Sequence, residues 1–187
     1  MKFAIFVSFF LMVFSICVSA KDSGGLATEH EVVIDSFLDG FGVKKSSITG
    51  FKRSQVDLMK EMEGSWQGKP VIESCLSSAL APEVQYKEIV LESFKSSYDL
   101  EEARAAAEET ETKFTKEFLN LIFLASVMGD NPSKKLIKHA NENKEAYQRF
   151  EANIQPKKMK FVQSVIQPAT SKIYYSNIVN DCIAENS

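Results

Sequence analysis

Apolar side chains recur at intervals of three and four residues along most of this chain. Because an α-helix completes a turn about every 3.6 residues, such spacing places these side chains on one face of a helix. A clear example is the set Val33, Ile34, Phe37, Leu38 and Phe41. The period-two alternation that is typical of strands is missing from the sequence. The spacing therefore predicts an all-α fold built from amphipathic helices.

Five prolines divide the second part of the chain into predicted helices, and a new helical apolar pattern follows each of them. They are Pro70, Pro82, Pro132, Pro156 and Pro168. Proline is tolerated in the first turn of a helix, where its missing N–H group had no partner. We therefore expect a single-domain, irregular bundle of about six to eight helices, with short connections between antiparallel neighbours.

The longest predicted helix runs from Asp99, as its N-cap, to Met128. Glu102 lies three residues after Asp99, which is the spacing of a capping box, and Thr28 and Glu31 form the same pattern earlier in the chain. A helix of this length would extend about 43 Å. We expect it to be the central helix against which the others pack.

The two halves of this helix differ. The first half, up to Glu117, is acidic and rich in alanine, whereas the second half is apolar on nearly all sides and must be surrounded. The sequence is consistent with bundle core or with the lining of an apolar ligand cavity. The candidate lining residues are Phe114, Phe118, Leu121 and Ile122, together with aromatic residues such as Phe37 and Trp66.

The N-terminal segment resembles a secretory signal peptide. Lys2 provides a short basic start, an apolar run extends to Val18, and Val18-Ser19-Ala20 is a small-residue cleavage pattern. We therefore expect residues 1–20 to be a signal peptide and residues 21–187 a secreted helical domain; a retained membrane anchor is the alternative. The next most apolar stretch, 118–128, would be only about 16 Å long as a helix, so we expect no transmembrane helix in the mature chain.

Two of the three cysteines, Cys75 and Cys182, lie outside the predicted signal peptide. In an oxidising compartment an isolated pair is most simply one disulfide. Neither residue belongs to a C-x-x-C motif or lies near a histidine. We therefore predict a Cys75–Cys182 disulfide that connects the last helix to the first half of the chain.

Residue types typical of catalysis are scarce. The chain has two histidines, His30 and His139, and lacks zinc-ligand spacing, a nucleophile elbow, a glycine-rich phosphate loop and an EF-hand pattern. We therefore expect no enzymatic activity, no cofactor and no metal site. A net charge of −3 also argues against nucleic-acid binding, which favours a strongly basic face.

One segment reverses the overall charge. Residues 132–160 carry eight Lys and Arg side chains against three Glu, a net charge of +5. Lys134 and Lys135 follow Pro132, and Lys157 and Lys158 follow Pro156, so both pairs lie at predicted helix N-termini. Because the helix dipole disfavours cations there, these four lysines form a candidate anion site. The alternative is that they are solvated and face the acidic half of the 99–128 helix.

These patterns favour a secreted, non-enzymatic helical protein that binds another macromolecule. The alternative function is a carrier of an apolar or amphipathic small molecule, such as a lipid or fatty acid. The partner is then an unknown protein, a lipid-like ligand or an anionic surface.

Overall fold

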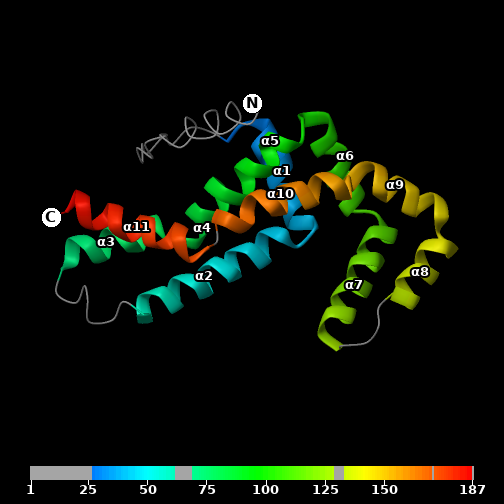
Figure 1. The fold of residues 1–187 in the computed structure, drawn as a ribbon. Helices are drawn as coiled ribbons and strands as arrows, with labels where there is room; N and C mark the ends of the chain where they lie inside the picture. Colours follow the sequence, from blue (N-terminus) through cyan, green and yellow to red (C-terminus); the bar gives the residue numbers. More distant parts are fainter. Residues whose placement is uncertain (1–26, 62–68, 129–132, 170, 187) are drawn as a thin grey trace, which may run out of the picture.

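The computed structural model describes residues 27–61, 69–128, 133–169 and 171–186, and within these ranges all regular elements are helical (Figure 1). The helical segment from residue 82 to residue 97 is continuous and contains a central π-helical stretch, η1. The elements are α1 (Glu29–Gly40), α2 (Val43–Glu61), α3 (Pro70–Ala79), α4 (Pro82–Gln85), η1 (Tyr86–Leu91), α5 (Glu92–Ser97), α6 (Leu100–Thr110), α7 (Lys113–Met128), α8 (Ser133–Glu142), α9 (Lys144–Ile154), α10 (Pro156–Ala169) and α11 (Lys172–Glu185). The predicted all-α class is confirmed.

The predicted capping boxes are both present. The Thr28 Oγ1 atom accepts a hydrogen bond from the Glu31 amide at 3.3 Å, and Glu31 Oε2 accepts one from the Thr28 amide at 2.7 Å. At the start of α6, Asp99 and Glu102 exchange the same two bonds at 2.9 and 3.0 Å. These contacts satisfy N–H groups that lack partners within the helix and so define where α1 and α6 begin.

Three prolines begin helices as predicted, and one does not. Pro70, Pro82 and Pro156 are the first residues of α3, α4 and α10, while Pro132 lies outside the described residues. Pro168 was expected to begin the last helix but lies inside the end of α10. A proline there cannot donate the usual hydrogen bond and its ring crowds the carbonyl four residues earlier, and α10 ends one residue later, at Ala169. The last helix instead begins after Ser171, whose Oγ accepts a hydrogen bond from the Tyr174 amide.

The prediction of one long helix from Asp99 to Met128 is wrong. Helix α6 ends at Thr110 and α7 begins at Lys113, so the two halves are separate helices joined by a short connection (Figure 1). The apolar pattern predicted between residues 133 and 154 is likewise divided, at Asn143. Both breaks increase the number of helices beyond the predicted range.

The main core forms where α1 packs against α6, with α5, α9 and α10 around them. Phe37 and Tyr98 are among its largest fully buried side chains, and their ring centroids are 5.5 Å apart. Helices α7 and α8 lie side by side and extend away from this core (Figure 1). We call this pair of helices the arm.

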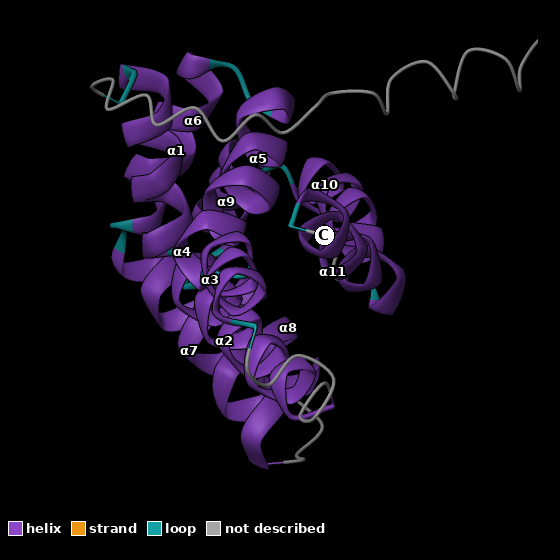
Figure 2. Ribbon diagram, turned by 90° about the vertical axis from the view of Figure 1, so that its left-hand side faces the viewer, coloured by secondary structure: helices purple, strands orange, loops and turns teal. Residues whose placement is uncertain are grey.

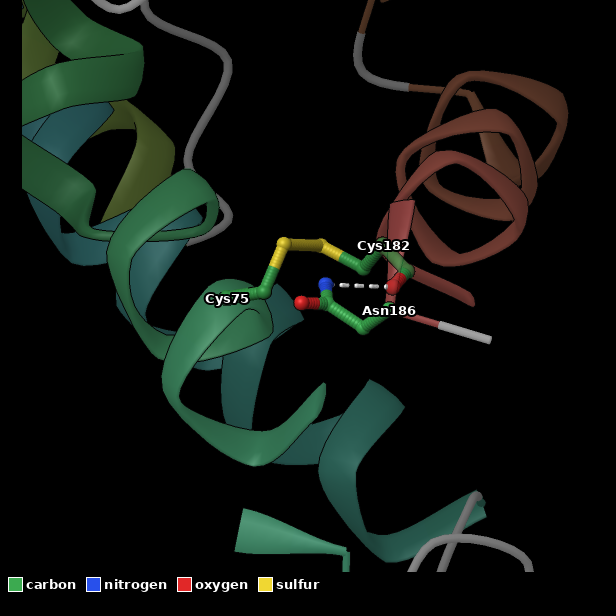
Figure 3. The surroundings of a disulfide bond; sticks show 3 residues. All are labelled: Cys75, Cys182 and Asn186. Atoms are coloured by element: carbon green, nitrogen blue, oxygen red, sulfur yellow. Dashed lines mark hydrogen bonds between the residues drawn. A yellow bond between two sulfur atoms is a disulfide. The ribbon is translucent and has the colours of Figure 1, made fainter. Parts of the chain in front are cut away.

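A second, smaller cluster joins α3 to α11. Ile72, Leu76 and Tyr175 are buried in it, and the predicted disulfide between Cys75 and Cys182 is present beside them (Figure 3). The two cysteines are separated by 107 positions. In Figure 2, α10 and α11 lie together on one side of the molecule. Within the described ranges, no helix has both the length and the hydropathy needed to cross a bilayer.

Candidate interaction surface

A buried carboxylate determines how α6, α7 and α9 meet. Glu109, at the end of α6, is only 2 % exposed. Its Oε2 accepts hydrogen bonds from Arg149 Nε at 2.8 Å and from Asn153 Nδ2 at 3.0 Å. Its Oε1 accepts bonds from the hydroxyls of Thr115 at 3.0 Å and Thr112 at 3.1 Å. Both oxygens are therefore satisfied by donors from α7, α9 and the connection between α6 and α7.

These contacts explain the break in the predicted long helix. The Thr112 hydroxyl donates to the Glu109 carbonyl and accepts from the Thr115 amide at 3.2 Å, which is the role of a cap at the start of α7. Burial raises the pKa of Glu109, but the hydrogen bonds from Arg149, Asn153, Thr115 and Thr112 outweigh it and leave the pKa below its ordinary value. The ionised carboxylate thus holds the base of the arm against α6.

Two of the predicted ligand-lining residues, Phe114 and Phe118, lie in an aromatic cluster. The rings of Phe114 and Phe118 are stacked at 5.5 Å, and Phe150 of α9 lies 5.3 Å from Phe118. His139 of α8 stacks on Phe114 at 5.1 Å, while Tyr147 lies 5.7 Å from Phe118. These rings pack against one another and join α7 to α8 and α9. The aromatic residues at the start of α7 thus contact both α8 and α9.

The other candidates in that prediction are more distant from the cluster. Leu121 is half-buried and Ile122 is 39 % exposed, both further along α7. Phe37 belongs to the main core, where its ring contacts those of Phe41, Phe94 and Tyr98. Trp66 lies outside the described residues.

The structure does not bring the four candidate anion-binding lysines together. Lys134 and Lys135 are exposed at the start of α8, at the end of the arm farther from α9, whereas α10 begins beside α6 (Figure 1). Lys157 is exposed, but Lys158 forms an ion pair with Glu102 and lies over the Tyr98 ring at 5.2 Å. Lys158 therefore faces the acidic α6, as the alternative interpretation of this basic segment expected.

Helix α10 has a buried side and a strongly exposed side. Val162 is completely buried in the main core, with Met159 and Ile166 packed beside it. Phe161 faces away from the core and is 62 % exposed, and Val165, at the edge of the core face, is 48 % exposed. A stripe of exposed side chains at helical spacing runs along the exposed side and consists of Lys157, Lys160, Phe161, Ser164, Val165 and Pro168. We call it the outer stripe of α10.

The position of α10 is held from its first turn. Gln155, between α9 and α10, adopts a left-handed conformation with φ of 50°, which ends α9 and turns the chain. The buried Tyr98 hydroxyl donates to the Ile154 carbonyl at 2.7 Å, and Gln155 Nε2 donates to Glu102 Oε1 at 3.3 Å. Together with the Lys158–Glu102 pair, these bonds tie the first turn of α10 to the start of α6. Helix α10 packs against α5 and η1, and its outer stripe faces outward.

Sequence reasoning recognised the lysines of this segment but missed the stripe. Two signals were present. Phe161 and Val165 occupy positions i and i+4 on a face that lacks the core residues, and no Asp or Glu occurs between Glu151 and Asp181. In a chain whose net charge is −3, this acid-free stretch carries four lysines and is a local excess of positive charge on α10 and the start of α11.

No protein-family model, curated protein or solved structure matches this chain. Among the described residues, no group of three or more His, Cys, Asp or Glu side chains is placed to hold a metal ion. The function must therefore be inferred from the surface and packing of the helices.

Proposed function

We propose that this protein is a non-enzymatic interaction protein that binds another macromolecule or assembly through the outer stripe of α10. The observation that carries the proposal is Phe161, an aromatic side chain 62 % exposed on a helix whose other side is fully buried at Val162. Because Phe161 and Val165 are only about half exposed, burying the rest of each side chain against a partner would contribute about 1–1.5 kcal/mol. Aromatic side chains on rigid supports are typical anchors of binding surfaces.

We also propose that the protein acts after secretion. Residues 1–20 have the pattern of a signal peptide and lie outside the described residues. The Cys75–Cys182 disulfide supports this proposal, since such bonds persist in oxidising compartments.

The carrier alternative has less support. The two best-placed residues for lining a ligand cavity are Phe114 and Phe118. Their rings pack against each other and against Phe150 in the aromatic cluster. A carrier would have to separate these rings to admit a ligand. The carrier would be favoured if the protein bound a fluorescent fatty acid saturably, if the Phe118→Ala variant lost this binding and if the Phe161→Ser variant kept it.

Photo-crosslinking tests the proposed surface. A photoreactive amino acid at position 161 should become linked to a protein or lipid when the secreted chain is irradiated in the fluid or on the cells that it meets. The matched control is position 32, because Val32 is 56 % exposed on α1, outside the stripe. The control position should yield little product.

A competition experiment tests whether the crosslink at position 161 is specific. An excess of unlabelled wild-type protein should suppress the product at position 161, whereas the F161S/V165S variant should not. Equal products at positions 161 and 32, or equal suppression by the wild type and the variant, would overturn the proposed surface.

A further inference from the structure

We infer that the outer stripe of α10 binds the surface of an anionic lipid bilayer, an inference that rests on the proposed function. In this arrangement α10 lies along the bilayer surface, with Phe161 and Val165 inserted among the lipids. Lys157 and Lys160 contact anionic headgroups. The inference depends on the charge of α10, on the composition of its stripe and on its place in the fold.

The charge of α10 is one-sided. The helix contains Lys157, Lys158 and Lys160 and no acidic residue. Since Lys158 is paired with Glu102, the basic side chains exposed on the helix are Lys157 and Lys160. Both lie on the outer stripe, one turn and one residue before Phe161. Each lysine near an anionic membrane surface strengthens binding by roughly fivefold.

The composition of the stripe distinguishes a bilayer from a protein partner. Lysine is depleted from the centres of protein–protein interfaces, where it is costly to desolvate. Helices that lie in the membrane interface instead combine lysine with phenylalanine, because the ammonium group stays among the headgroups while the ring enters the acyl boundary. Lys160 and Phe161 are adjacent and both exposed, which matches the second pattern.

Helix α10 lies at one side of the molecule, where an extended surface such as a bilayer can contact it. Helices α10 and α11 lie on the right-hand side of the molecule in Figure 2, and the other helices lie to their left. Ile173, in the first turn of α11, is 74 % exposed and adds a third apolar side chain to these two helices. The apolar side chains Phe161, Val165 and Ile173 all belong to the segment from residue 152 to residue 180, which contains no acidic residue.

Vesicle cosedimentation tests the inference with the secreted, disulfide-bonded protein recovered from a eukaryotic expression host. The probes are vesicles of phosphatidylcholine alone and of phosphatidylcholine mixed with phosphatidylserine. The protein should bind the mixed vesicles at least tenfold more strongly than the neutral ones. The K157Q/K160Q variant should lose roughly 30-fold of this binding, and F161S/V165S should lose binding to a similar extent.

Two matched variants provide the controls. K134Q/K135Q removes an equally exposed lysine pair from the arm, and Val32→Ser removes an exposed apolar side chain from α1. Both should bind the mixed vesicles like the wild type. All four variants change exposed side chains, so each should keep the wild-type circular dichroism spectrum.

Three outcomes would overturn the bilayer inference: no binding to mixed vesicles, equal binding to both vesicle types, or equal losses in K157Q/K160Q and K134Q/K135Q. If vesicle binding is absent while position 161 still crosslinks specifically to a protein, the inference is wrong and the proposed function stands. If position 161 yields no specific product and vesicle binding is absent as well, both proposals are wrong.

Discussion

The Nε atom of Arg149 donates a hydrogen bond of 2.8 Å to Oε2 of Glu109, across a sequence separation of 40 residues. Arg149 is half-exposed, whereas the Glu109 side chain is almost completely buried. The carboxylate is therefore the partner that depends on this contact, since a buried charge without donors is strongly destabilising. The pair joins α6 to α9 at the base of the arm.

Replacing Glu109 with glutamine should lower the free energy of unfolding by about 2 kcal/mol, because the charge-assisted bonds from Arg149 and its neighbours are lost. Urea denaturation at neutral pH measures this change. Glu108→Gln is the matched control: its side chain is exposed, so the expected change is within about 0.5 kcal/mol. Equal effects of the two substitutions would contradict the role given to Glu109.

The stabilisation that Glu109 contributes should depend on pH. The pKa of Glu109 in the folded protein is lower than its ordinary value of 4.5. The stabilisation from this lowered pKa is therefore fully present above pH 4.5 and is lost as the pH falls through the folded-state pKa. The difference in stability between the wild type and Glu109→Gln should shrink over that acidic range. A difference that stays constant down to the folded-state pKa would contradict the proposed charge interaction.

Glu31 should titrate at an unusually low pH. The side-chain hydrogen bond from Lys95, followed by bonds from the Thr28 amide and hydroxyl, lowers the pKa of Glu31 from 4.5 to about 2. Lys95→Gln should raise this pKa toward 4.5, and carboxyl-carbon NMR titration measures it. Lys113→Gln, which changes an exposed lysine on α7, should leave the titration of Glu31 unchanged. If Glu31 titrates in Lys95→Gln as it does in the wild type, Lys95 does not lower the pKa of Glu31.

Two glycines should respond oppositely to alanine. An added Cβ at Gly40 would lie 2.8 Å from Thr110 Cβ, whereas at Gly50 it would meet nothing within 4 Å. Gly40→Ala should therefore separate α1 from α6 and lower the free energy of unfolding by about 1–3 kcal/mol. Gly50→Ala should raise it by about 0.5–1 kcal/mol, because alanine has the higher helix propensity. Thermal or urea unfolding of the two variants checks both signs.

Removing the disulfide should release α11. The Cys75–Cys182 bond closes a loop across 107 positions, and C75S/C182S should lower the free energy of unfolding by about 2–5 kcal/mol. Amide hydrogen exchange should rise first in α11 and α3, which share the small cluster around Tyr175. Reducing the disulfide of the wild-type protein should produce the same early rise of hydrogen exchange in α11 and α3. Uniform exchange across all helices would contradict it.

Several local features could be predicted because their causes are local. Apolar spacing predicted helices, and Thr28 and Asp99 predicted two helix starts because a capping box is completed within three residues. Pro70, Pro82 and Pro156 marked helix starts through their missing N–H groups. The disulfide could be predicted because Cys17 lies in the predicted signal peptide, which leaves Cys75 and Cys182 as a pair.

The break at residues 111–112 could not be predicted in the same way. Apolar residues recur every seven positions from Leu100 to Met128, which is consistent with one continuous helix. The chain turns instead because Glu109 is buried against Arg149 and Asn153, which are 40 and 44 residues away. Nothing next to Glu109 in the sequence shows that these donors will be there.

The same limit applies to the proposed surface. The amino-acid sequence was sufficient for the helical class, five helix starts, the disulfide and the excess of basic residues after Pro132. Only the tertiary structure showed that Lys158 is neutralised by Glu102 while Lys157, Lys160 and Phe161 remain exposed. Helix periodicity specifies which side chains share a face, but which face is buried depends on neighbours brought together by the rest of the chain.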